Sequence, residues 1–448
     1  MNLLRLINIS IIIFTVSGVF AENINLEQAM TLALANSRSL AKYNLAITGT
    51  TLDGKTLLFS SLPSLSLGAS AGMSLWSSAR SAPVENPLDT FSAGVNVGVS
   101  QRIFEGGRSA VQRAINALAT ESARIDAHAE YFNVLESAEN AYYAVLEAES
   151  TLEAEEYALQ NAISSLSIAE IRQTSGMISP GDYLRAMVEK ENRENSRNQA
   201  RRSLALAKTR LRSLTGLSQI DALEPVDFSG YEELIIFLGN ISDEDADSLY
   251  NRLRVSISAS NPSLARAGLS KERSEQNLIL ANRAFLPSIG ASFSTGLNIT
   301  QEGGFEMSGG RVSLSASIPI DYWSINNNIE KSKIARDSAA MDYVSAESQL
   351  DTELQSTLLN LFAVAGSVLS SRRSLEYSEQ HFEYVAERYR LSQGSISDYG
   401  EATLLLINSR NSSIRASYGF LQGLSRLRLL GAVDDEERLM NILLGKNL

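Results

Sequence analysis

The sequence contains no cysteine, two histidines and only eight prolines among its 448 residues. The lack of cysteine excludes a disulfide framework, a thiol nucleophile and an N-terminal cysteine that could carry lipid. His128 and His381 lie in separate predicted helices, so a zinc cluster cannot be assembled within one chain. The glycine pairs are isolated and form no phosphate-binding loop after a strand. We therefore expect no enzymatic activity, no metal and no cofactor.

Long apolar runs and clustered positive charge are also lacking. Beyond residues 1–21 no apolar run approaches the roughly 18 residues that a membrane helix needs, so any membrane span must be made of strands. The formal net charge is -12. Phosphate binding requires clustered lysine and arginine, so a nucleic acid is not expected as a partner.

Residues 1–21 have the composition of a secretory signal peptide. One basic residue, Arg5, precedes an apolar run that ends near Val19 and Ala21. Small residues one and three positions before a break favour cleavage by signal peptidase. We expect cleavage between Ala21 and Glu22 and export of the mature chain, with an uncleaved anchor helix as the alternative.

Four segments alternate strictly between apolar and small polar residues. A period of two predicts strands with Leu, Val and Phe on one face and Ser, Gly and Asn on the other. The first and third segments begin with the same triplet, Leu62-Pro63-Ser64 and Leu286-Pro287-Ser288. The predicted strands cover about 64–76, 91–103, 288–300 and 310–320.

Four strands cannot close into a barrel by themselves. An open sheet edge in lipid would leave unpaired backbone groups, so the strands must close with copies of the same chain. A dimer gives eight strands and a filled interior, whereas a trimer gives twelve strands and room for a pore. The small, uncharged inward face favours the trimer and a pore with little charge selectivity, and a soluble β-sandwich is the alternative.

Long helices are predicted at 104–173 and 324–392, where good helix formers dominate and proline is absent. Apolar residues recur at seven-residue spacing in both, as in coiled coils: Ala138, Val145, Leu152, Leu159 and Leu166, then Leu354, Leu361, Val368, Leu375, Phe382 and Tyr389. Each ends at a turn rich in Gly and Ser. Shorter helices return over 182–215 and 398–431, with Gly216 and Gly431 as predicted C-caps.

The same order of elements occurs twice, which predicts an internal two-fold repeat in a membrane α+β protein. Each repeat opens with a helix, Leu26 to about Ser60 in the first and about Ile241 to Phe285 in the second. The predicted organisation is a signal peptide (1–21), a first repeat (22–220), an acidic and irregular segment (221–247), a second repeat (248–431) and a C-terminal tail (432–448).

Several local sequences fit this duplicated order. They are the opening Ile24-Asn25-Leu26-Glu27-Gln28-Ala29, its counterpart Asn261-Pro262-Ser263-Leu264, the junction from Gln101 to Arg108, the two Leu-Pro-Ser triplets and the two glycine-bearing turns. With these features the chain resembles the TolC family of outer-membrane efflux and type I secretion duct proteins. The resemblance covers nearly all of the mature chain, and the order and duplication of the motifs carry it.

The resemblance implies a homotrimer in the outer membrane. A 12-stranded barrel would continue into a long α-helical coiled-coil barrel in the periplasm, with the acidic segment and the tail around it. It implies a passive exit duct that receives substrate from an inner-membrane transporter of the RND, ABC or MFS type through a periplasmic adaptor. The alternative is a trimeric periplasm-spanning tether or surface receptor that the barrel only anchors.

The resemblance also assigns roles to residues. The helix turns that dock the adaptor would contain Gly176, Ile178 and Ser179, and Gly394, Ile396 and Ser397. The family's acidic gate positions in the second turn fall on Gly400 and Thr403, so that assignment fails residue for residue. Asp182, Asp398 and Glu401 are the remaining gate candidates, although carboxylates at a helix N-terminus are also favoured by the helix dipole.

Aromatic residues are placed where a membrane-interface girdle is expected. Trp76 and Phe91 flank the loop between the first two strands, and Phe104, Tyr322 and Trp323 lie on the helix side of the strands. Simple packing at strand ends is the alternative explanation.

Overall fold

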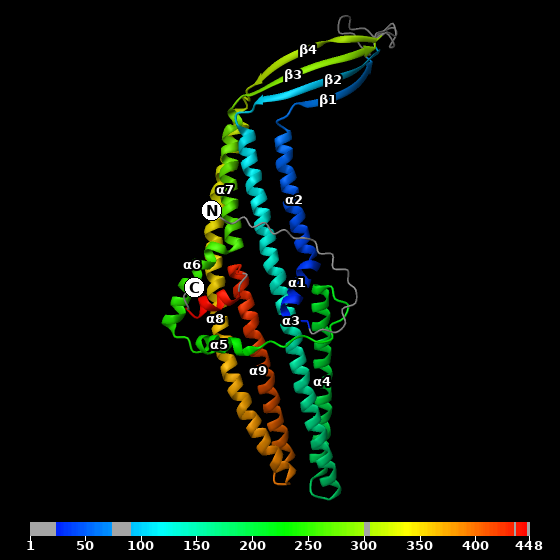
Figure 1. The fold of residues 1–448 in the computed structure, drawn as a ribbon, viewed down its shortest axis with the longest axis vertical. Helices are drawn as coiled ribbons and strands as arrows, with labels where there is room; N and C mark the ends of the chain where they lie inside the picture. Colours follow the sequence, from blue (N-terminus) through cyan, green and yellow to red (C-terminus); the bar gives the residue numbers. More distant parts are fainter. Residues whose placement is uncertain (1–23, 74–90, 300–304, 434–435, 446–448) are drawn as a thin grey trace.

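The computed structural model describes residues 24–73, 91–299, 305–433 and 436–445. The molecule is elongated, with a sheet at one end and two helical hairpins at the other (Figure 1). The predicted cleavage point at Ala21 and Glu22 and the predicted interface residue Trp76 lie outside the described residues. The same holds for the side chain of Phe91.

The sheet has four antiparallel strands in the order β1-β2-β3-β4. Its register aligns like with like across the sheet, so that Leu65, Val99, Phe293 and Val312 form one row on the apolar face. The neighbouring row, on the other face, consists of small residues over three of the four strands. The strands are β1 (Ser64–Met73), β2 (Phe91–Phe104), β3 (Ser288–Ile299) and β4 (Phe305–Ser317).

The fourth strand was predicted at 310–320, and its bounds are shifted toward the N-terminus. It begins at Phe305, which pairs with Ile299, and it ends at Ser317. Pro319 has no backbone N–H to give to a ladder, so the apolar residues Ile318 and Ile320 do not continue the strand. An alternation of apolar residues beyond a proline was therefore misleading.

Two helices run most of the length of the molecule, and shorter helices flank them (Figure 1). The long helix α3 packs against α2 and α7 on the sheet side and against α4 and α9 on the far side. The other long helix, α8, packs against α7 and α9. The helices are α1 (Leu26–Asn36), α2 (Arg38–Phe59), α3 (Arg108–Thr174), α4 (Pro180–Thr215), α7 (Pro262–Asn282), α8 (Tyr322–Arg390) and α9 (Ile396–Gly431).

The two opening helices were each predicted as continuous, and each is broken. Ser37 and Asn261 have extended backbones, and their side chains cap the next helix by accepting from the N–H of Leu40 at 3.1 Å and of Leu264 at 2.9 Å. Short polar side chains satisfy free N–H groups at a helix start better than they support a helix interior. Pro262 then takes the first helical position, where its missing N–H does no harm.

The segment 221–247 was predicted as irregular, which is wrong. It contains η2 (Phe228–Tyr231), α5 (Glu232–Gly239) and the start of α6 (Asp243–Ser260). Leu234, Ile235 and Leu238 are fully buried against α8, in the largest apolar core among the described residues. The acidic residues dominate the composition of this segment, but they stay outside while the intervening apolar residues pack.

The heptad spacing holds in α8, where Leu354, Leu361 and Val368 are buried. In α3 the predicted positions Ala138 and Val145 are buried, but the predicted leucines that follow them are not. From Glu155 onward the buried seam consists of mostly small residues at alternating three- and four-residue steps: Glu155, Ala158, Ala162, Ser165, Ala169 and Arg172. Leu152, Leu159 and Leu166 are only half-buried, because small residues allow α3 and α9 to approach closely while leucines flank the contact.

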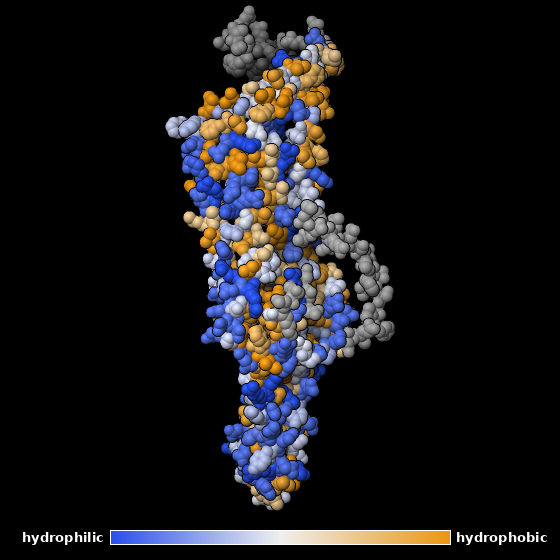
Figure 2. Space-filling model, turned by 60° about the vertical axis from the view of Figure 1, so that its left-hand side comes forward, coloured by the Kyte–Doolittle hydropathy of each residue, from blue (hydrophilic) through white to orange (hydrophobic). Residues whose placement is uncertain are grey.

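Hydrophobic surface gathers over the strands and the helices next to them, and the far end is mostly hydrophilic (Figure 2). Among the described residues, one helix, α8, contains a window long and apolar enough to cross a membrane by composition alone. The sequence-based expectation of no such run is therefore wrong for α8. Leu354, Leu361 and Val368 of this helix lie in the protein core, and 39% of the apolar window is buried.

Candidate functional site

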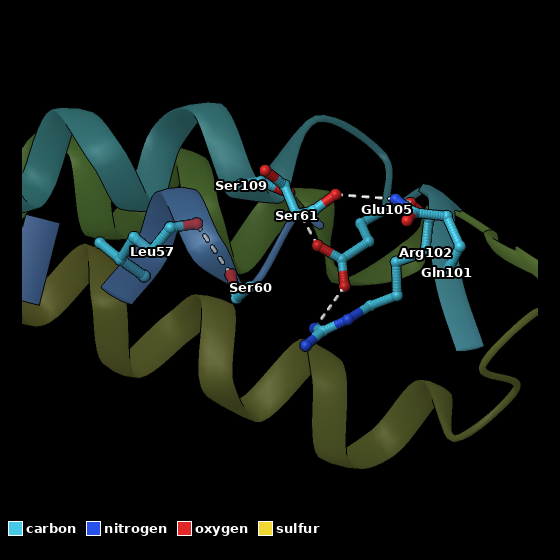
Figure 3. Close-up of polar contacts among 7 residues, drawn as sticks. All are labelled: Leu57, Ser60, Ser61, Gln101, Arg102, Glu105 and Ser109. Atoms are coloured by element: carbon cyan, nitrogen blue, oxygen red, sulfur yellow. Dashed lines mark hydrogen bonds and ion pairs between the residues drawn. The ribbon is translucent and has the colours of Figure 1, made fainter. Parts of the chain in front are cut away.

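The first strand-to-helix junction is held by a set of polar contacts (Figure 3). Gln101 Nε2 donates to the carbonyl oxygen of Ser61 at 2.7 Å, which ties β2 to the end of the first opening helix. Glu105 accepts from the Ser109 hydroxyl on one carboxylate oxygen and from Arg102 Nη1 on the other, both at 2.7 Å. These two hydrogen bonds, that of Ser109 first, lower the pKa of the Glu105 carboxyl.

Two consecutive left-handed glycines complete this junction. Gly106 has φ 63° and Gly107 has φ 71°, values that residues with a Cβ rarely adopt. A Cβ on Gly106 would lie 2.5 Å from Cβ of Leu286, and one on Gly107 would collide with the Arg283 guanidinium. Arg283 Nη1 donates to the Gly107 carbonyl at 2.6 Å. The start of the second strand pair is therefore seated on the first junction.

The second junction uses other chemistry. Asp321 caps α8 by accepting from the N–H of Ser324 at 3.2 Å. Tyr322 and Trp323 follow, both exposed, and the Tyr322 ring packs on Phe285 with centroids 6.0 Å apart. Together with Phe104, these residues lie at the helix side of the sheet, where a membrane-interface girdle was expected. The girdle role itself stays a prediction.

The first helix tip joins α3 to α4. Gly176 lies two residues beyond Thr174 with φ 70°, and the N–H of Met177 returns to the Arg172 carbonyl at 2.8 Å, as in a Schellman turn. Ser179 caps α4 by accepting from the N–H of Asp182 at 3.1 Å. Ile178 is the link between the two caps.

The second tip, between α8 and α9, repeats this turn with different residues. Ser392 lies two residues beyond Arg390 with φ 63°, and the N–H of Gln393 returns to the Arg388 carbonyl at 2.8 Å. Ser395 caps α9 in a capping box with Asp398.

The structure therefore corrects the matching of the two tips. The counterpart of Gly176 is Ser392, not Gly394, because Gly394 stands directly before the N-cap as Ile178 does. Ile396 and Ser397 are the first residues of α9, equivalent to the Pro180 and Gly181 that start α4. The predicted C-cap at Gly431 is also wrong, since α9 extends through Gly431 and the left-handed cap is Ala432.

The gate candidates differ in the hydrogen bonds that their carboxylates already accept. Asp182 accepts from the Ser179 hydroxyl at 2.8 Å, and Asp398 accepts from the N–H of Ser395 at 3.4 Å, so both complete N-terminal caps. Glu401 is exposed one turn further along α9. Thr403, at a family gate position, is buried, and its hydroxyl donates to the Tyr399 carbonyl at 2.8 Å. A carboxylate at 403 would therefore have to replace a packed side chain.

The two hairpins are tied together near their tips. Arg172 of α3 is 7% exposed, donates to the carbonyl oxygen of Tyr389, and places its guanidinium 4.4 Å from the centroid of that ring. Tyr399 donates to the Asn161 carbonyl at 3.4 Å, and burial, followed by the nearby Tyr157 and Tyr389, raises its pKa to about 12. The phenol therefore stays neutral and able to donate.

A second tie lies further up the same pair of helices. Glu139 of α3 is 3% exposed and accepts from Arg428 Nη1 of α9 at 2.6 Å and from the Ser425 hydroxyl. Breaking a buried pair of this kind by removing one partner typically costs about 3–5 kcal/mol. The tie thus holds the second hairpin against the first.

Grooves open beside the tips. One of about 560 Å³ lies between the hairpins and is lined mainly by α4 and α9, including Leu184, Val188 and Leu404. Another of about 410 Å³ lies between α8 and α9 and is lined by His381, Arg388 and Glu401. Exposed apolar residues surround the first tip, among them Met177 at 70%.

The two histidines lie apart. His128 packs edge-on against Phe132 with ring centroids 5.0 Å apart, and His381 lines the groove between α8 and α9. Within the described part of the chain, no three His, Cys, Asp or Glu side chains are grouped to hold a metal ion.

Sequence reasoning missed both ties between the hairpins. Tyr389 was expected in the core from its heptad position, but no feature of the sequence identified Arg172 as its partner. Arg172 follows Ala169 on the small-residue seam by three positions, and that spacing was the available signal. Glu139 and Arg428 lie far apart in the sequence, and only the packing of α3 on α9 pairs them.

Comparison with known proteins fits this architecture. A family model described as "Outer membrane efflux protein" matches residues 29–217 and 253–432. The outer membrane protein TolC of Escherichia coli (strain K12) is 21% identical over 67% of this chain, and the match spans 61% of that protein's length.

Solved structures show the same fold. The Campylobacter jejuni CmeC outer membrane channel superposes with a TM-score of 0.74 at 16% identity, over 93% of this chain and 89% of that one. The outer membrane protein VceC of Vibrio cholerae superposes with a TM-score of 0.72 at 16% identity, over 91% and 96%. The match to the outer membrane efflux protein model locates the protein in the outer membrane, with its helical part in the periplasm. Because the family model matches both halves of the molecule and well over half of its residues, the chain belongs to the outer membrane efflux protein family, a family of channels rather than enzymes.

Proposed function

We propose that the protein works as a homotrimer and is the passive exit duct of a tripartite efflux pump or a type I secretion system. The observation that carries the proposal is the sheet. It has one apolar face, one small polar face and two unpaired edges, β1 and β4. In lipid such edges must pair, and β4 of one copy can pair with β1 of the next.

The helices support closure in the same direction. No residue of α2 is buried, and its Leu45, Leu52 and Leu58 are exposed. At the opposite edge of the helical layer, α8 exposes Ile334, Met341 and Val344 (Figure 1). Two apolar edges on opposite sides of one chain fit a ring of copies.

Three copies would give a twelve-stranded barrel, which is wide enough for a lumen. On the sheet side α2, α3, α7 and α8 pack side by side in that order, and on the far side α4, α3, α9 and α8 do. Three copies would therefore also give twelve helices around the axis. The similar order of elements in the two halves supports an internal two-fold repeat and hence a pseudo-sixfold tube. Substrate would pass from an inner-membrane transporter and a periplasmic adaptor to the exterior.

The proposed docking surface for the adaptor is the pair of helix tips. It comprises Gly176, Ile178, Ser179, Gly394, Ile396 and Ser397, beside the exposed apolar side chains around Met177. Gly176→Val and Gly394→Val should abolish export in cells while trimers still form. Leu206→Ala, at an exposed position of α4 away from the tips, is the matched control. Normal export by both tip variants would refute this docking surface.

The proposed gate is formed by Asp182, Asp398 and Glu401. Since the two aspartates already serve as helix caps, Glu401 is the residue whose neutralisation tests the gate most directly. Glu401→Gln should reduce the preference for cations in single-channel recordings without changing helix stability. Unchanged ion preference in Glu401→Gln and in Asp398→Asn would exclude an acidic gate there.

Conductance of the purified trimer in planar bilayers tests the function as a whole. A duct should give discrete channels, whereas a tether or surface receptor needs no continuous lumen and should give none. Leu52→Glu, which places charge on the exposed edge of α2, should prevent trimer formation and remove the channels. Leu206→Ala should leave both intact.

A further inference from the structure

The β4 strand contains a bulge that decides the direction of one charged side chain. Opposite Ser294 and Gly296 of β3, the partner residues on β4 are Arg311 and Ser308, so β4 has one residue more than β3 at this point. Gly309 and Gly310 fill the step. As a result Ser308, paired with Gly296, and Arg311, paired with Ser294, both lie on the small polar face of the sheet.

Without the bulge, strict alternation would place Arg311 on the apolar face and Val312 on the polar face. An arginine facing lipid near the membrane centre destabilises an outer-membrane barrel by about 2–4 kcal/mol. The ring of Phe293 closes over the bulge, because a Cβ on Gly310 would lie 3.0 Å from Phe293 Cε2. The glycines, the bulge and the packed ring together hold Arg311 on the polar face.

The surroundings of Arg311 are uncharged. Its row across the sheet consists of Ser66, Gly98 and Ser294, and the next row pairs the hydroxyls of Ser292 and Ser313 at 2.9 Å. No ion pair with Arg311 exists among the residues that the structure describes, and its side chain is exposed.

Other charges on the polar face are distant or neutralised. Glu306 lies at the outer end of β4. Its partner on β3, Asn298, is four residues from Ser294, the partner of Arg311, which is roughly 13 Å along the strand. Arg102 on β2 is paired with Glu105 at 2.7 Å. The described part of β1, which would pair with β4 of a neighbouring copy, contains no charged residue. Closing the barrel therefore adds no partner for Arg311 from these residues.

We propose that three Arg311 side chains, one from each copy, form a ring in the barrel lumen that attracts and transiently binds anionic groups of the transported solutes. The chemical class is carboxylate, phosphate or sulfate, which the guanidinium binds with paired N–H donors. An unpaired ring of like charge in a low-dielectric wall raises the local concentration of counter-ions. This proposal rests on the proposed duct function, and it replaces the expectation of a strand region with little charge selectivity.

The test uses the purified mature protein in planar bilayers with a KCl gradient at low ionic strength. Arg311→Gln should raise the ratio of potassium to chloride permeability severalfold, because the field of the ring extends over a Debye length of about 10 Å at 0.1 M salt. Arg311→Lys should stay close to wild type, and Glu306→Gln should shift the ratio in the opposite direction. At 1 M salt the difference should vanish, since the Debye length falls to about 3 Å.

A second measurement has its main readout on the wild-type protein. Citrate added to one side should reduce the single-channel current of the wild-type protein at low salt, and Arg311→Gln should be insensitive. Citrate without effect on wild type, or ion permeabilities that are equal in wild type and Arg311→Gln, overturns the arginine ring while leaving the duct function standing. A wild-type protein without any channels would instead overturn the duct, and the ring with it.

Discussion

The two helical hairpins, α3 with α4 in the first half and α8 with α9 in the second, make similar turns with different residues. Where the first half needs a left-handed residue it uses glycine, at the tip (Gly176) and at the end of the returning helix (Gly216). The second half uses Ser392 and Ala432 at the same two places. A residue with a Cβ in this conformation costs roughly 1–2 kcal/mol, so the second half contains strain that the first avoids.

The packing of the two returning helices favours the second half instead. The returning helix of the first half, α4, has five buried residues, whereas α9 has thirteen. The reason is that α9 packs on both long helices, while α4 packs mainly on α3. The second hairpin is thus strained in its turns but held by its neighbours, and the first is relaxed in its turns but peripheral. The following variants test this contrast, from the largest expected effect to the smallest.

Gly106→Ala should have the largest effect. The new methyl group would meet Leu286 at 2.5 Å in a left-handed backbone, and neither strain can be relieved without moving the start of β3. We expect a loss of more than about 3 kcal/mol and few trimers in the outer membrane. Ile320→Ala at the second junction, where the side chain is 92% exposed, should leave trimer yield unchanged.

Trimer yield is measured by gel migration without heating, and the loss of stability by the urea midpoint of unfolding. Equal sensitivity of the two junctions would show that the first does not depend on its glycines. Leu286→Ala combined with Gly106→Ala should recover little of the loss, because alanine at 286 keeps the Cβ that lies 2.5 Å from the new methyl group, and the backbone strain also remains.

The tie between the hairpins should show the next largest effect. Arg172 and Arg388 occupy equivalent positions near the ends of their long helices, but Arg172 is buried on Tyr389 and Arg388 is exposed. Arg172→Met should destabilise the tips by about 1.5–3 kcal/mol, the range for a hydrogen bond to a charged group. Arg388→Met should cost less than about 1 kcal/mol. Hydrogen exchange of the tip amides measures both.

If the two arginine variants exchanged equally fast, the asymmetry between the hairpins would not depend on this contact. Tyr389→Phe serves as a control, since it removes the hydroxyl that donates to Ser165 at 3.4 Å but keeps the ring under the guanidinium. The tip amides of Tyr389→Phe should exchange nearly as slowly as those of the wild-type protein.

The sequence predicted the outline of the fold because periodicity reports local structure. Alternation identified the sheet faces, and the seven-residue spacing identified α3 and α8. It failed where a residue's role depends on partners far along the chain. The small-residue seam of α3 looks like a solvated helix face until α9 packs on it, and Leu234, Ile235 and Leu238 are masked by the acids around them.

The candidate site was predictable in the same uneven way. Glycine and serine marked both tips, since turns require them. Equivalence between the tips could not be read from glycine alone, because Ser392 takes the left-handed position and Gly394 does not. Arg311 was overlooked because alternation before Val312 is interrupted by the bulge, and a bulge depends on the register of the neighbouring strand.

Glu105 gives the two junctions a different response to pH. Its pKa is lowered in the folded protein, so the stability that its hydrogen bonds contribute is present above the unfolded pKa near 4.5 and is lost as pH falls through the folded value. Glu105→Gln should remove about 1 kcal/mol at neutral pH and flatten the fall in the urea midpoint below pH 4.5. If the urea midpoint of Glu105→Gln fell below pH 4.5 as steeply as that of wild type, the loss of stability in acid would be due to other carboxylates.

Exchanging the turn residues between the tips should give the smallest effects, with opposite signs. Ser392→Gly relieves a left-handed serine and should stabilise the second tip by about 0.5–1 kcal/mol, reduced by the extra freedom of glycine in the unfolded chain. Gly176→Ser introduces the same strain and should destabilise the first tip by about 1 kcal/mol, since no other atom lies within 4 Å of the new Cβ. Local hydrogen exchange at each tip reads out both variants. Changes of the same sign would mean that the backbone angle is not what distinguishes the two turns, and that the difference between the hairpins lies in the packing of α9 alone.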